Sequence, residues 1–333
     1  MKALVTGGTG FVGSHVVEAL VARGDRVTCL VRSPRKAAGL FPTGAPIEFI
    51  LGQLADERAL ERAAKDADVI FHVAGLTGAR RGANLLAVNR DGTARVLAAA
   101  RRTAPRLTRF MYVSSMSAAG PSRFGEQRKE SDPSAPVSAY GRSKLAAEDE
   151  VRRSNLPWTI VRPPSVYGPR DREFLRLFRL AAGGIVPALG SPAQELSFVH
   201  ARDLAAALLA ATAPACAGRT YYASHPEVVT ARDTVLAMQL AVARVRRRSM
   251  KRPARMIQIP PALGRIALWA SAAGAALMGR DAVLNPDKLS EFRAEGWACR
   301  PAALERDTGW RAALAAREGF LDTAEWYVQH RWL

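Results

Sequence analysis

The first 23 residues constrain the fold of this chain more than any other stretch. Residues 2–6 form an apolar run typical of a β-strand, a glycine-rich turn follows, and residues 14–23 have the pattern of a helix. A turn between a strand and a helix presents backbone N–H groups and the positive helix end to a pyrophosphate. Glycine spacing alone is weak evidence, but this context strengthens it. We therefore predict a dinucleotide site that includes Gly7, Thr9, Gly10, Phe11, Val12 and Gly13.

Strand-like and helix-like segments then alternate along the chain. This alternation predicts a parallel sheet with helices on both faces, an α/β doubly wound Rossmann fold. A length of 333 residues allows one large domain and a smaller region. In such sheets ligands bind outside the carboxyl ends of the strands. The further strand-like segments are 26–31, 47–51, 68–73, 110–115 and 158–162.

The end of the second strand indicates which dinucleotide is bound. NAD sites usually place an acidic residue there to hold the ribose 2′-hydroxyl, and Val31 occupies that position here. Arg32, Arg35 and Lys36 follow and could neutralise a 2′-phosphate, so NADP(H) is favoured over NAD(H). The alternative is a solvated basic loop in an arginine-rich protein. The remaining expected cofactor contacts are Ser33, then Gln53 and Leu54 near the adenine, and Val73, Ala74 and Gly75 after the fourth strand.

Tyr140 and Lys144 are four residues apart in a segment of helical composition, so their side chains share one helix face. An ammonium about 4 Å from a phenol could lower its pKa from about 10 toward neutrality. The same spacing is also common on solvated helix faces. Ser115 ends the fifth strand, where a hydroxyl can hydrogen-bond a reacting carbonyl oxygen. These three residues are the candidate catalytic groups.

The charge and the cysteine content indicate which binding partners and bound metals can be expected. The formal net charge is +18, but most of the 48 basic residues are arginines spread along an alanine-rich chain. The excess of arginine is better explained by genome composition than by a surface that binds nucleic acid. The 3 cysteines are scattered, so neither a disulfide framework nor a metal site is expected. Because the first strand follows the initial Met directly, we expect no signal peptide and a cytoplasmic location.

Seven ordered segments together resemble the extended short-chain dehydrogenase/reductase family, over almost the whole chain. The resemblance implies a catalytic serine, tyrosine and lysine at Ser115, Tyr140 and Lys144, cofactor contacts from Pro163 and Val166, and a homodimer. The segments are 6–13, 72–75, 89–93, 112–115, 140–144, 162–169 and 198–205.

Departures from the family pattern narrow the chemistry. Dehydratase members have an acidic pair after the serine, where this chain has Met116 and Ser117, so elimination would lack its general base. Sugar-nucleotide enzymes usually have Asn at the position of Ser165 and Arg within 195–197, and both are absent. Gln53 replaces the usual Asp near the adenine. The remaining motifs look more like those of the branch that contains 3β-hydroxysteroid dehydrogenases and dihydroflavonol reductases.

We expect residues 1–165 and 198–224 to bind the dinucleotide, and residues 166–197 and 225–333 to form a smaller, mostly helical substrate-binding region. Within it, a basic stretch, 244–255, precedes a largely apolar one, 257–279. This order is typical of an interfacial membrane anchor, although a core helix of the lid over the nicotinamide is the favoured interpretation. Arg265 and nearby Pro and Gly residues argue against a transmembrane span.

These observations predict an NADP(H)-preferring oxidoreductase that interconverts a ketone and a secondary alcohol on a small or lipophilic molecule. Two alternatives stay open. One is an epimerase of a (nucleotide) sugar that oxidises its substrate transiently and uses the same three residues. The other is a cofactor-loaded regulatory module without turnover. The absence of an acidic pair after Ser115 favours plain redox chemistry over dehydration.

Overall fold

The central element is a seven-stranded sheet in which every neighbouring pair of strands is parallel. The computed structural model describes the chain except residues 79–81, 250–251, 261, 265, 267 and 269–288. Much of the expected membrane stretch, 244–279, therefore lies outside the described residues. In spatial order the strands are β10 (Arg219–Tyr222), β6 (Trp158–Arg162), β5 (Arg109–Val113), β4 (Val69–His72), β1 (Lys2–Thr6), β2 (Arg26–Val31) and β3 (Ile47–Leu51).

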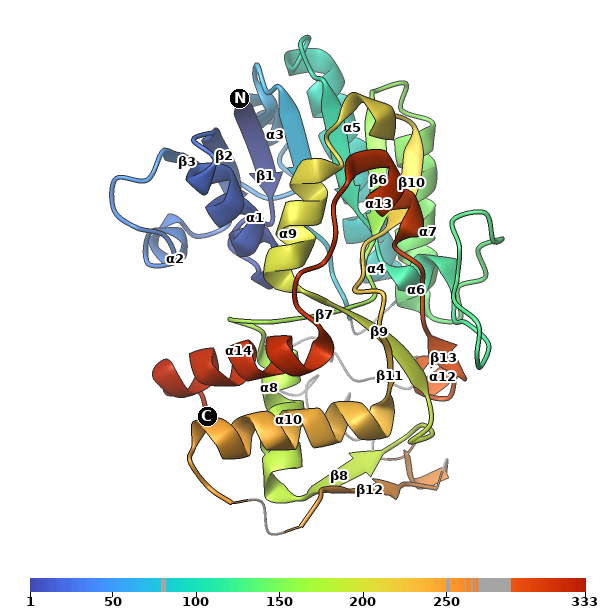
Figure 1. The fold of residues 1–333 in the computed structure, drawn as a ribbon. Coiled ribbons are helices and arrows are strands. Elements are labelled where there is room, and N and C mark those ends of the chain that lie inside the picture. The colour runs from blue at the N-terminus through green and yellow to red at the C-terminus, as the bar shows by residue number, and fades with distance from the viewer. Residues whose placement is uncertain (79–81, 250–251, 261, 265, 267, 269–288) are drawn as a thin grey trace.

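The chain runs outward from β1 to β3, then returns to β4 on the other side of β1. The strand order thus reverses between β1 and β4, which is where doubly wound sheets bind their ligands. The predicted α/β Rossmann fold is confirmed, and Figure 1 shows the helices on both faces of the sheet.

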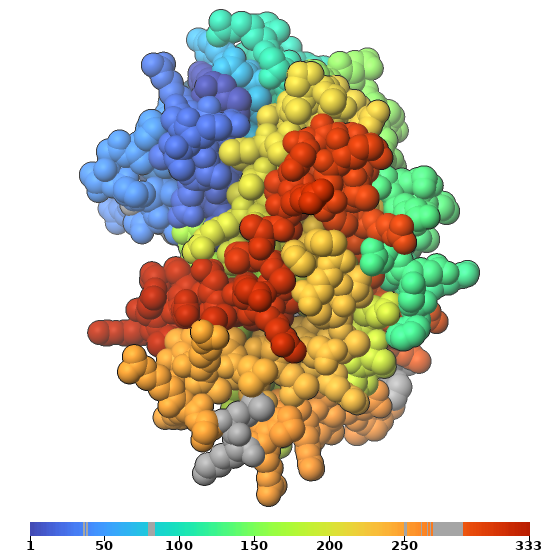
Figure 2. Space-filling model, in the orientation of Figure 1, coloured from blue at the N-terminus to red at the C-terminus, as the bar shows by residue number. Residues whose placement is uncertain are grey.

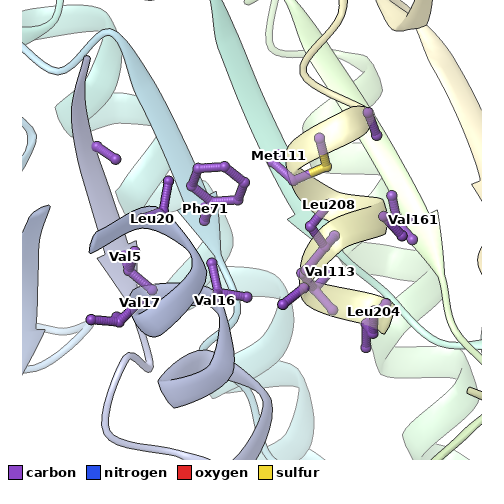
Figure 3. Packing of buried hydrophobic residues seen from close by; sticks show 14 of the residues in the cluster. Val5, Val16, Val17, Leu20, Phe71, Met111, Val113, Val161, Leu204 and Leu208 are labelled. Carbon is purple, nitrogen blue, oxygen red and sulfur yellow. The ribbon is translucent and has the colours of Figure 1, made fainter. Parts of the chain in front are cut away.

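Two apolar layers hold helices against the sheet, because successive strand residues point to opposite faces. On one face α1 (Phe11–Ala22) and α9 (Ala201–Ala210) cover the buried strand residues. Figure 3 shows Val16 and Leu20 of α1 and Leu208 of α9 beside Phe71 and Met111 of the sheet. The opposite layer is covered by α3 (Glu57–Ala64), α5 (Gly92–Thr103) and α7 (Ala139–Arg152).

Short helices connect these elements along the strand ends. They are α2 (Pro34–Ala38), α4 (Gly82–Leu86), a π-helical turn (Ala87–Asp91), α6 (Met116–Ala119) and a 3₁₀ turn (Pro214–Cys216). The π-helical turn and α6 lie beside α7. Both of them therefore help to build the edge of the sheet where the site residues gather.

A second region extends beyond the carboxyl ends of the strands (Figure 1). Its four-stranded sheet has the order β11–β9–β13, and β7 also pairs with β9. These strands are β7 (Ser165–Tyr167), β9 (Glu195–His200), β11 (Val228–Thr230) and β13 (Gly296–Trp297), and a separate parallel pair is β8 (Ile185–Ala188) with β12 (Arg255–Gln258). The remaining helices are α8 (Arg172–Gly183), α10 (Ala231–Val245), α12 (Leu289–Phe292), α13 (Ala302–Thr308) and α14 (Ala316–Gln329).

An aromatic core joins α8, α10 and α14 to β7 and β9. Phe320 of α14 contacts the rings of Tyr167, Phe178 and Phe198, with ring centroids 4.6, 6.0 and 5.5 Å apart. This core is separate from the two layers that pack on the Rossmann sheet. Within the described residues, we find no helix both long and apolar enough to span a membrane.

Candidate active site

The glycine-rich turn between β1 and α1 has the shape that its glycines were expected to allow. The Gly10 N–H donates to the Gly7 carbonyl at 2.9 Å, and Gly7 has a φ of +74°. A Cβ on Gly7 would lie 2.8 Å from the backbone of Ala74, and a Cβ on Gly13 would collide with the Gly7 carbonyl. Among the described residues, no side chain caps the start of α1. Its first N–H groups therefore suit a pyrophosphate.

The end of β4 lies directly against this turn. Val73 N–H donates to the Thr6 carbonyl at 3.2 Å, and Ala74 N–H donates to Thr6 Oγ1 at 3.4 Å. A Cβ on Gly75 would be 3.8 Å from Lys144 Nζ. The fold thus brings the glycine turn, residues 73–75 and Lys144 together, as expected for residues that bind one dinucleotide.

The other predicted cofactor residues lie along the same edge of the sheet. Arg32 and Ser33 are exposed directly after β2, and Lys36 lies in α2. Leu54 follows β3 and packs against Gly92 at the start of α5, where a Cβ would be 2.9 Å from Leu54 Cδ1. The other members of this set are Gln53 beside Leu54, Pro163 after β6 and Val166 in β7.

Ser115 and Tyr140 meet where β5 ends and α7 begins. Ser115 Oγ accepts the Ser117 N–H at 3.1 Å and caps α6, while Ser138 Oγ accepts the Gly141 N–H at 3.0 Å and caps α7. These caps fix both backbones, and the Ser115 side chain is close enough to the phenol of Tyr140 to act on its pKa. Two hydroxyl groups therefore lie together at the carboxyl end of the sheet.

Lys144 lies one turn after Tyr140 in α7 and is buried. Its Nζ donates to the Val113 carbonyl at 2.7 Å and lies 4.4 Å from the centroid of the Tyr112 ring. Burial lowers the pKa of Lys144 to about 7, although the Glu148 carboxylate acts in the opposite direction. The Val113 carbonyl at the end of β5 thus holds the Lys144 ammonium.

The structure differs from the expectation that Lys144 lowers the pKa of Tyr140. Burial raises the pKa of Tyr140 to about 12, the hydrogen bond from Ser115 opposes this, and the carboxylates of Glu291 and Glu173 raise it further. The phenol therefore keeps its proton at neutral pH. A protonated phenol suits proton donation to a carbonyl oxygen.

Asn89, which begins the segment 89–93 of the family resemblance, has a structural role in this site that the sequence did not indicate. It is buried in the π-helical turn, its Oδ1 accepts the Leu76 N–H at 2.8 Å, and its Nδ2 donates to the Leu76 carbonyl at 3.0 Å and to Ser143 Oγ at 2.9 Å. Asn89 thereby fixes the loop after β4 against α7. Irregular π-helical turns are frequent at functional sites, but no sequence pattern marks them.

A buried ion pair fixes α7 against the ends of β5 and β6. Arg162 Nε donates to Glu148 Oε1 at 2.8 Å and Arg162 Nη2 to Oε2 at 2.6 Å, while Ser114 Oγ donates to Oε1 at 2.6 Å. Burial acts to raise the pKa of Glu148, but hydrogen bonds and charge from Arg162 hold it below the ordinary value. The sequence analysis did not identify this pair.

His72 is a fully buried residue of β4. Its Nδ1 is 2.6 Å from Thr6 Oγ1 and its Nε2 is 2.9 Å from Thr93 Oγ1. Burial, aided by the charge of Lys144, lowers the pKa of His72 to about 3. The ring is therefore neutral at physiological pH and links β1, β4 and α5.

Comparison with known proteins places these features in context. The model of the "NAD dependent epimerase/dehydratase family" matches residues 3–222. The chain is 33% identical to the ceramide reductase of Caulobacter vibrioides, over 99% of this chain and 95% of that protein. It is 31% identical to the 4-hydroxy-2-methyl-3-oxo-4-farnesyl-3,4-dihydroquinoline-1-oxide ketoreductase of Stigmatella aurantiaca, over 96% of this chain and 98% of that protein.

The fold also has close structural counterparts. The structure of the Thermus thermophilus UDP-glucose 4-epimerase in complex with NAD superimposes with a TM-score of 0.75 at 24% identity, covering 98% of this chain and 99% of that one. At this identity the likeness establishes the fold alone.

Proposed function

The chain belongs to the NAD dependent epimerase/dehydratase family, the extended short-chain dehydrogenases/reductases, and within it we propose that the protein is a ketoreductase. It would interconvert a ketone and a secondary alcohol on a small or lipophilic molecule, with NADP(H) preferred over NAD(H). The observation that carries this proposal is the grouping of Ser115 with Tyr140, one helical turn from Lys144, whose ammonium lies near Gly75 beside the glycine turn. Nearly full-length similarity to two reductases supports it.

The proposed mechanism follows from which group can donate a proton. When bound, the nicotinamide supplies the hydride to the carbonyl carbon. Tyr140 gives its proton to the carbonyl oxygen, because its raised pKa keeps the phenol protonated until charge develops on that oxygen. Ser115 donates a hydrogen bond to the same oxygen, and Lys144 holds the ribose next to the nicotinamide. The backbone N–H groups at the start of α1 would hold the pyrophosphate.

Net consumption of NADPH distinguishes the ketoreductase from the two alternatives, the epimerase and the regulatory module. We propose as the test an assay of a panel of ketones with free NADPH, followed by its absorbance. Ketone-dependent oxidation of NADPH supports the ketoreductase. Turnover of a nucleotide sugar without net change in the cofactor would replace it with the epimerase, which uses the same Ser115, Tyr140 and Lys144. No turnover of either kind would favour the regulatory module.

The cofactor preference gives a prediction at Arg32. Substitution Arg32→Ala should weaken NADPH binding about tenfold and leave NADH binding unchanged, because a charged hydrogen bond to the 2′-phosphate would be lost at an exposed position. Dissociation constants measured by fluorescence titration check this. Arg26→Ala, at the opposite end of β2, is the matched control. Equal affinities of the unaltered protein for NADPH and NADH would contradict the preference.

The division of labour along the chain is also part of the proposal. Residues 1–165 and 198–224 would bind the dinucleotide, and residues 166–197 and 225–333 would bind the substrate. We also propose that two copies associate as a homodimer, as the resemblance to the family implied.

We propose further that the described part of 244–279 contacts a membrane surface peripherally. In the β8–β12 pair, Arg255 lies beside Ile185 and Ile257 beside Pro187, on the outward face. The exposed fractions of Ile185 and Ile257 are 56% and 53%. Exposed arginines precede β12 in the chain at residues 246–248 and 252, and the exposed Arg255 begins the strand. Figure 2 shows this orange stretch at the end of the molecule farthest from the N-terminus.

This contact predicts binding to anionic vesicles. The protein should float with phosphatidylcholine vesicles that contain phosphatidylglycerol, and replacing arginines 246–248 together by Gln should weaken binding roughly a hundredfold, since each basic residue contributes about 1 kcal/mol. A control that replaces Arg58, Arg101 and Arg106 by Gln removes the same charge elsewhere. Equal flotation of both triple variants would contradict a membrane contact through this part of the molecule.

A further inference from the structure

Helix α12 lies over the start of α7, next to the candidate catalytic tyrosine. Ser138 Oγ donates to Glu291 Oε1 at 2.5 Å, and Ser290 Oγ donates to the Val137 carbonyl at 2.9 Å. Ser138 is two residues before Tyr140 in the sequence. The carboxylate of Glu291 is therefore fixed at the start of the helix that carries the reactive phenol, although the two residues are far apart in the chain.

The backbone of α12 is held in place from the substrate-binding side. Gln194 Nε2 donates to the carbonyls of Phe292 at 3.2 Å and Ala294 at 2.7 Å. Trp297 Nε1 donates to the Glu291 carbonyl at 2.9 Å. Gln194 precedes β9 and Trp297 lies in β13, so the four-stranded sheet holds α12 against α7. The position of Glu291 is thus determined by both regions of the molecule.

A second carboxylate acts on the same phenol. Glu173 lies in the first turn of α8, where its N–H is fixed by Asp171 Oδ1 at 2.8 Å. Glu291 and Glu173 both act to raise the pKa of Tyr140. Within the part of the chain that the structure describes, no Lys or Arg side chain forms an ion pair with either carboxylate. The two carboxylates therefore add negative charge near the phenol that a substrate carbonyl must meet, opposite in sign to the ammonium of Lys144.

We infer that Glu291, with Glu173 in support, determines substrate specificity by charge: the site accepts uncharged or cationic ketones and disfavours anionic ones. This inference rests on the proposed ketoreductase function. Its physical reason is repulsion between a substrate anion and the half-buried carboxylate of Glu291, because charges interact more strongly there than in bulk solvent. The exposed carboxylate of Glu173 adds a weaker repulsion. Esters, amides and amino ketones fit this class of substrate. Free β-keto acids and nucleotide diphosphates do not.

The test uses two substrates that share a ketone and differ in charge, β-ketolaurate and its methyl ester. The substitution Glu291→Gln keeps an acceptor oxygen for Ser138 but removes the charge. We expect kcat/KM for β-ketolaurate to rise about tenfold, equivalent to about 1.4 kcal/mol, and kcat/KM for the methyl ester to change less than about twofold. Glu173→Gln should act in the same direction with a smaller effect, because its side chain is exposed.

The pH profile gives an independent measurement with the methyl ester. Reduction requires a protonated Tyr140 and falls as the pH rises through its pKa. Because Glu291 raises that pKa, removing its charge lowers it, and the alkaline limb of kcat should move to lower pH in Glu291→Gln. Glu325→Gln, on the outer surface of α14, removes the same charge at an exposed position and should leave both readouts unchanged.

The possible failures are distinguishable. Equal changes in kcat/KM for both substrates in Glu291→Gln would show that the residue only positions α7, and would overturn the inference while leaving the ketoreductase in place. If Glu291→Gln does not fold, Glu173→Gln must still raise the ratio of kcat/KM for β-ketolaurate to kcat/KM for the methyl ester. An unchanged ratio in Glu173→Gln would also overturn the inference. Failure of the unaltered protein to reduce either substrate with NADPH would count against the proposed function itself.

Discussion

Substitution of Tyr140 by Phe is expected to lower kcat for ketone reduction roughly a hundred- to ten-thousandfold, the usual contribution of a positioned general acid. The change removes one oxygen, the phenol oxygen whose pKa the Ser115 side chain influences, and keeps the ring in α7. Ser115 would then have to stabilise the developing oxyanion without a proton donor beside it. NADPH oxidation under saturating ketone measures the effect, and the dissociation constant of NADPH should change less than about threefold.

Tyr221→Phe is the matched control for this loss. The same atom is removed, but Tyr221 lies in β10 and its hydroxyl donates to Asp307 at 2.7 Å, away from Ser115 and Lys144. Its kcat should be unchanged. Persistence of ketone reduction in Tyr140→Phe would exclude this residue as the proton donor, and persistence of the cellular function without turnover would support the regulatory module.

Substitution of Arg162 by Met is expected to reduce the free energy of unfolding by about 3–5 kcal/mol. Glu148 is fully buried, and Arg162 makes two hydrogen bonds to its carboxylate. Removing the guanidinium leaves a charge in the interior that keeps, among the described residues, its contacts with Ser114 and Arg152. Urea unfolding measures this loss. We expect a lower midpoint urea concentration and an unchanged dependence of the unfolding free energy on urea concentration.

The pH dependence of this loss identifies its cause. In the unaltered protein the pKa of Glu148 is lowered, so its contribution to stability is present above the ordinary carboxyl pKa and lost as the pH falls through the folded-state value. In Arg162→Met burial raises the pKa of Glu148 instead, so protonation relieves the buried charge. The difference in stability between the two proteins should therefore shrink as the pH falls toward about 4.

Arg152→Met provides the comparison for the buried pair. Its guanidinium also contacts Glu148 at 2.6 Å, but its side chain is 34% exposed, so water can replace the lost contact. The cost should stay below about 1 kcal/mol. A similar cost for both substitutions would show that burial of the Arg162 pair does not dominate the stability of this junction.

The sequence predicted those features that depend on neighbouring residues and on the regular geometry of the sheet. The glycine turn followed from the residues between β1 and α1, and the common helix face of Tyr140 and Lys144 followed from their spacing. The position of Ser115 at the carboxyl end of a sheet strand followed from the alternation of strands and helices, and its grouping with Tyr140 was implied by the resemblance to the family. Apart from that grouping, each of these predictions needs only local pattern and one topological rule.

Other features depend on tertiary packing and left no local signal strong enough to use. The direction of the Tyr140 pKa shift was wrong because burial and the carboxylates of Glu173 and Glu291 come from parts of the chain that no spacing rule connects. The pairing of Glu148 with Arg162 had a weak signal, since Arg162 ends an apolar strand and Glu148 lies four residues after Lys144 in α7. A charged residue in a buried run implies a partner but does not identify it.

The position of β10 in the sheet affects how the chain can fold as it is synthesised. This strand pairs with β6 at the sheet edge, yet it follows β7, α8 and β9 of the second region in the chain. Until residues 219–222 have left the ribosome, β6 is an edge strand with unpaired backbone groups, which other chains can bind. Completion of the seven-stranded sheet must therefore wait until β7, α8 and β9 of the second region have been synthesised, whereas α10 and α14 of that region follow β10 in the chain.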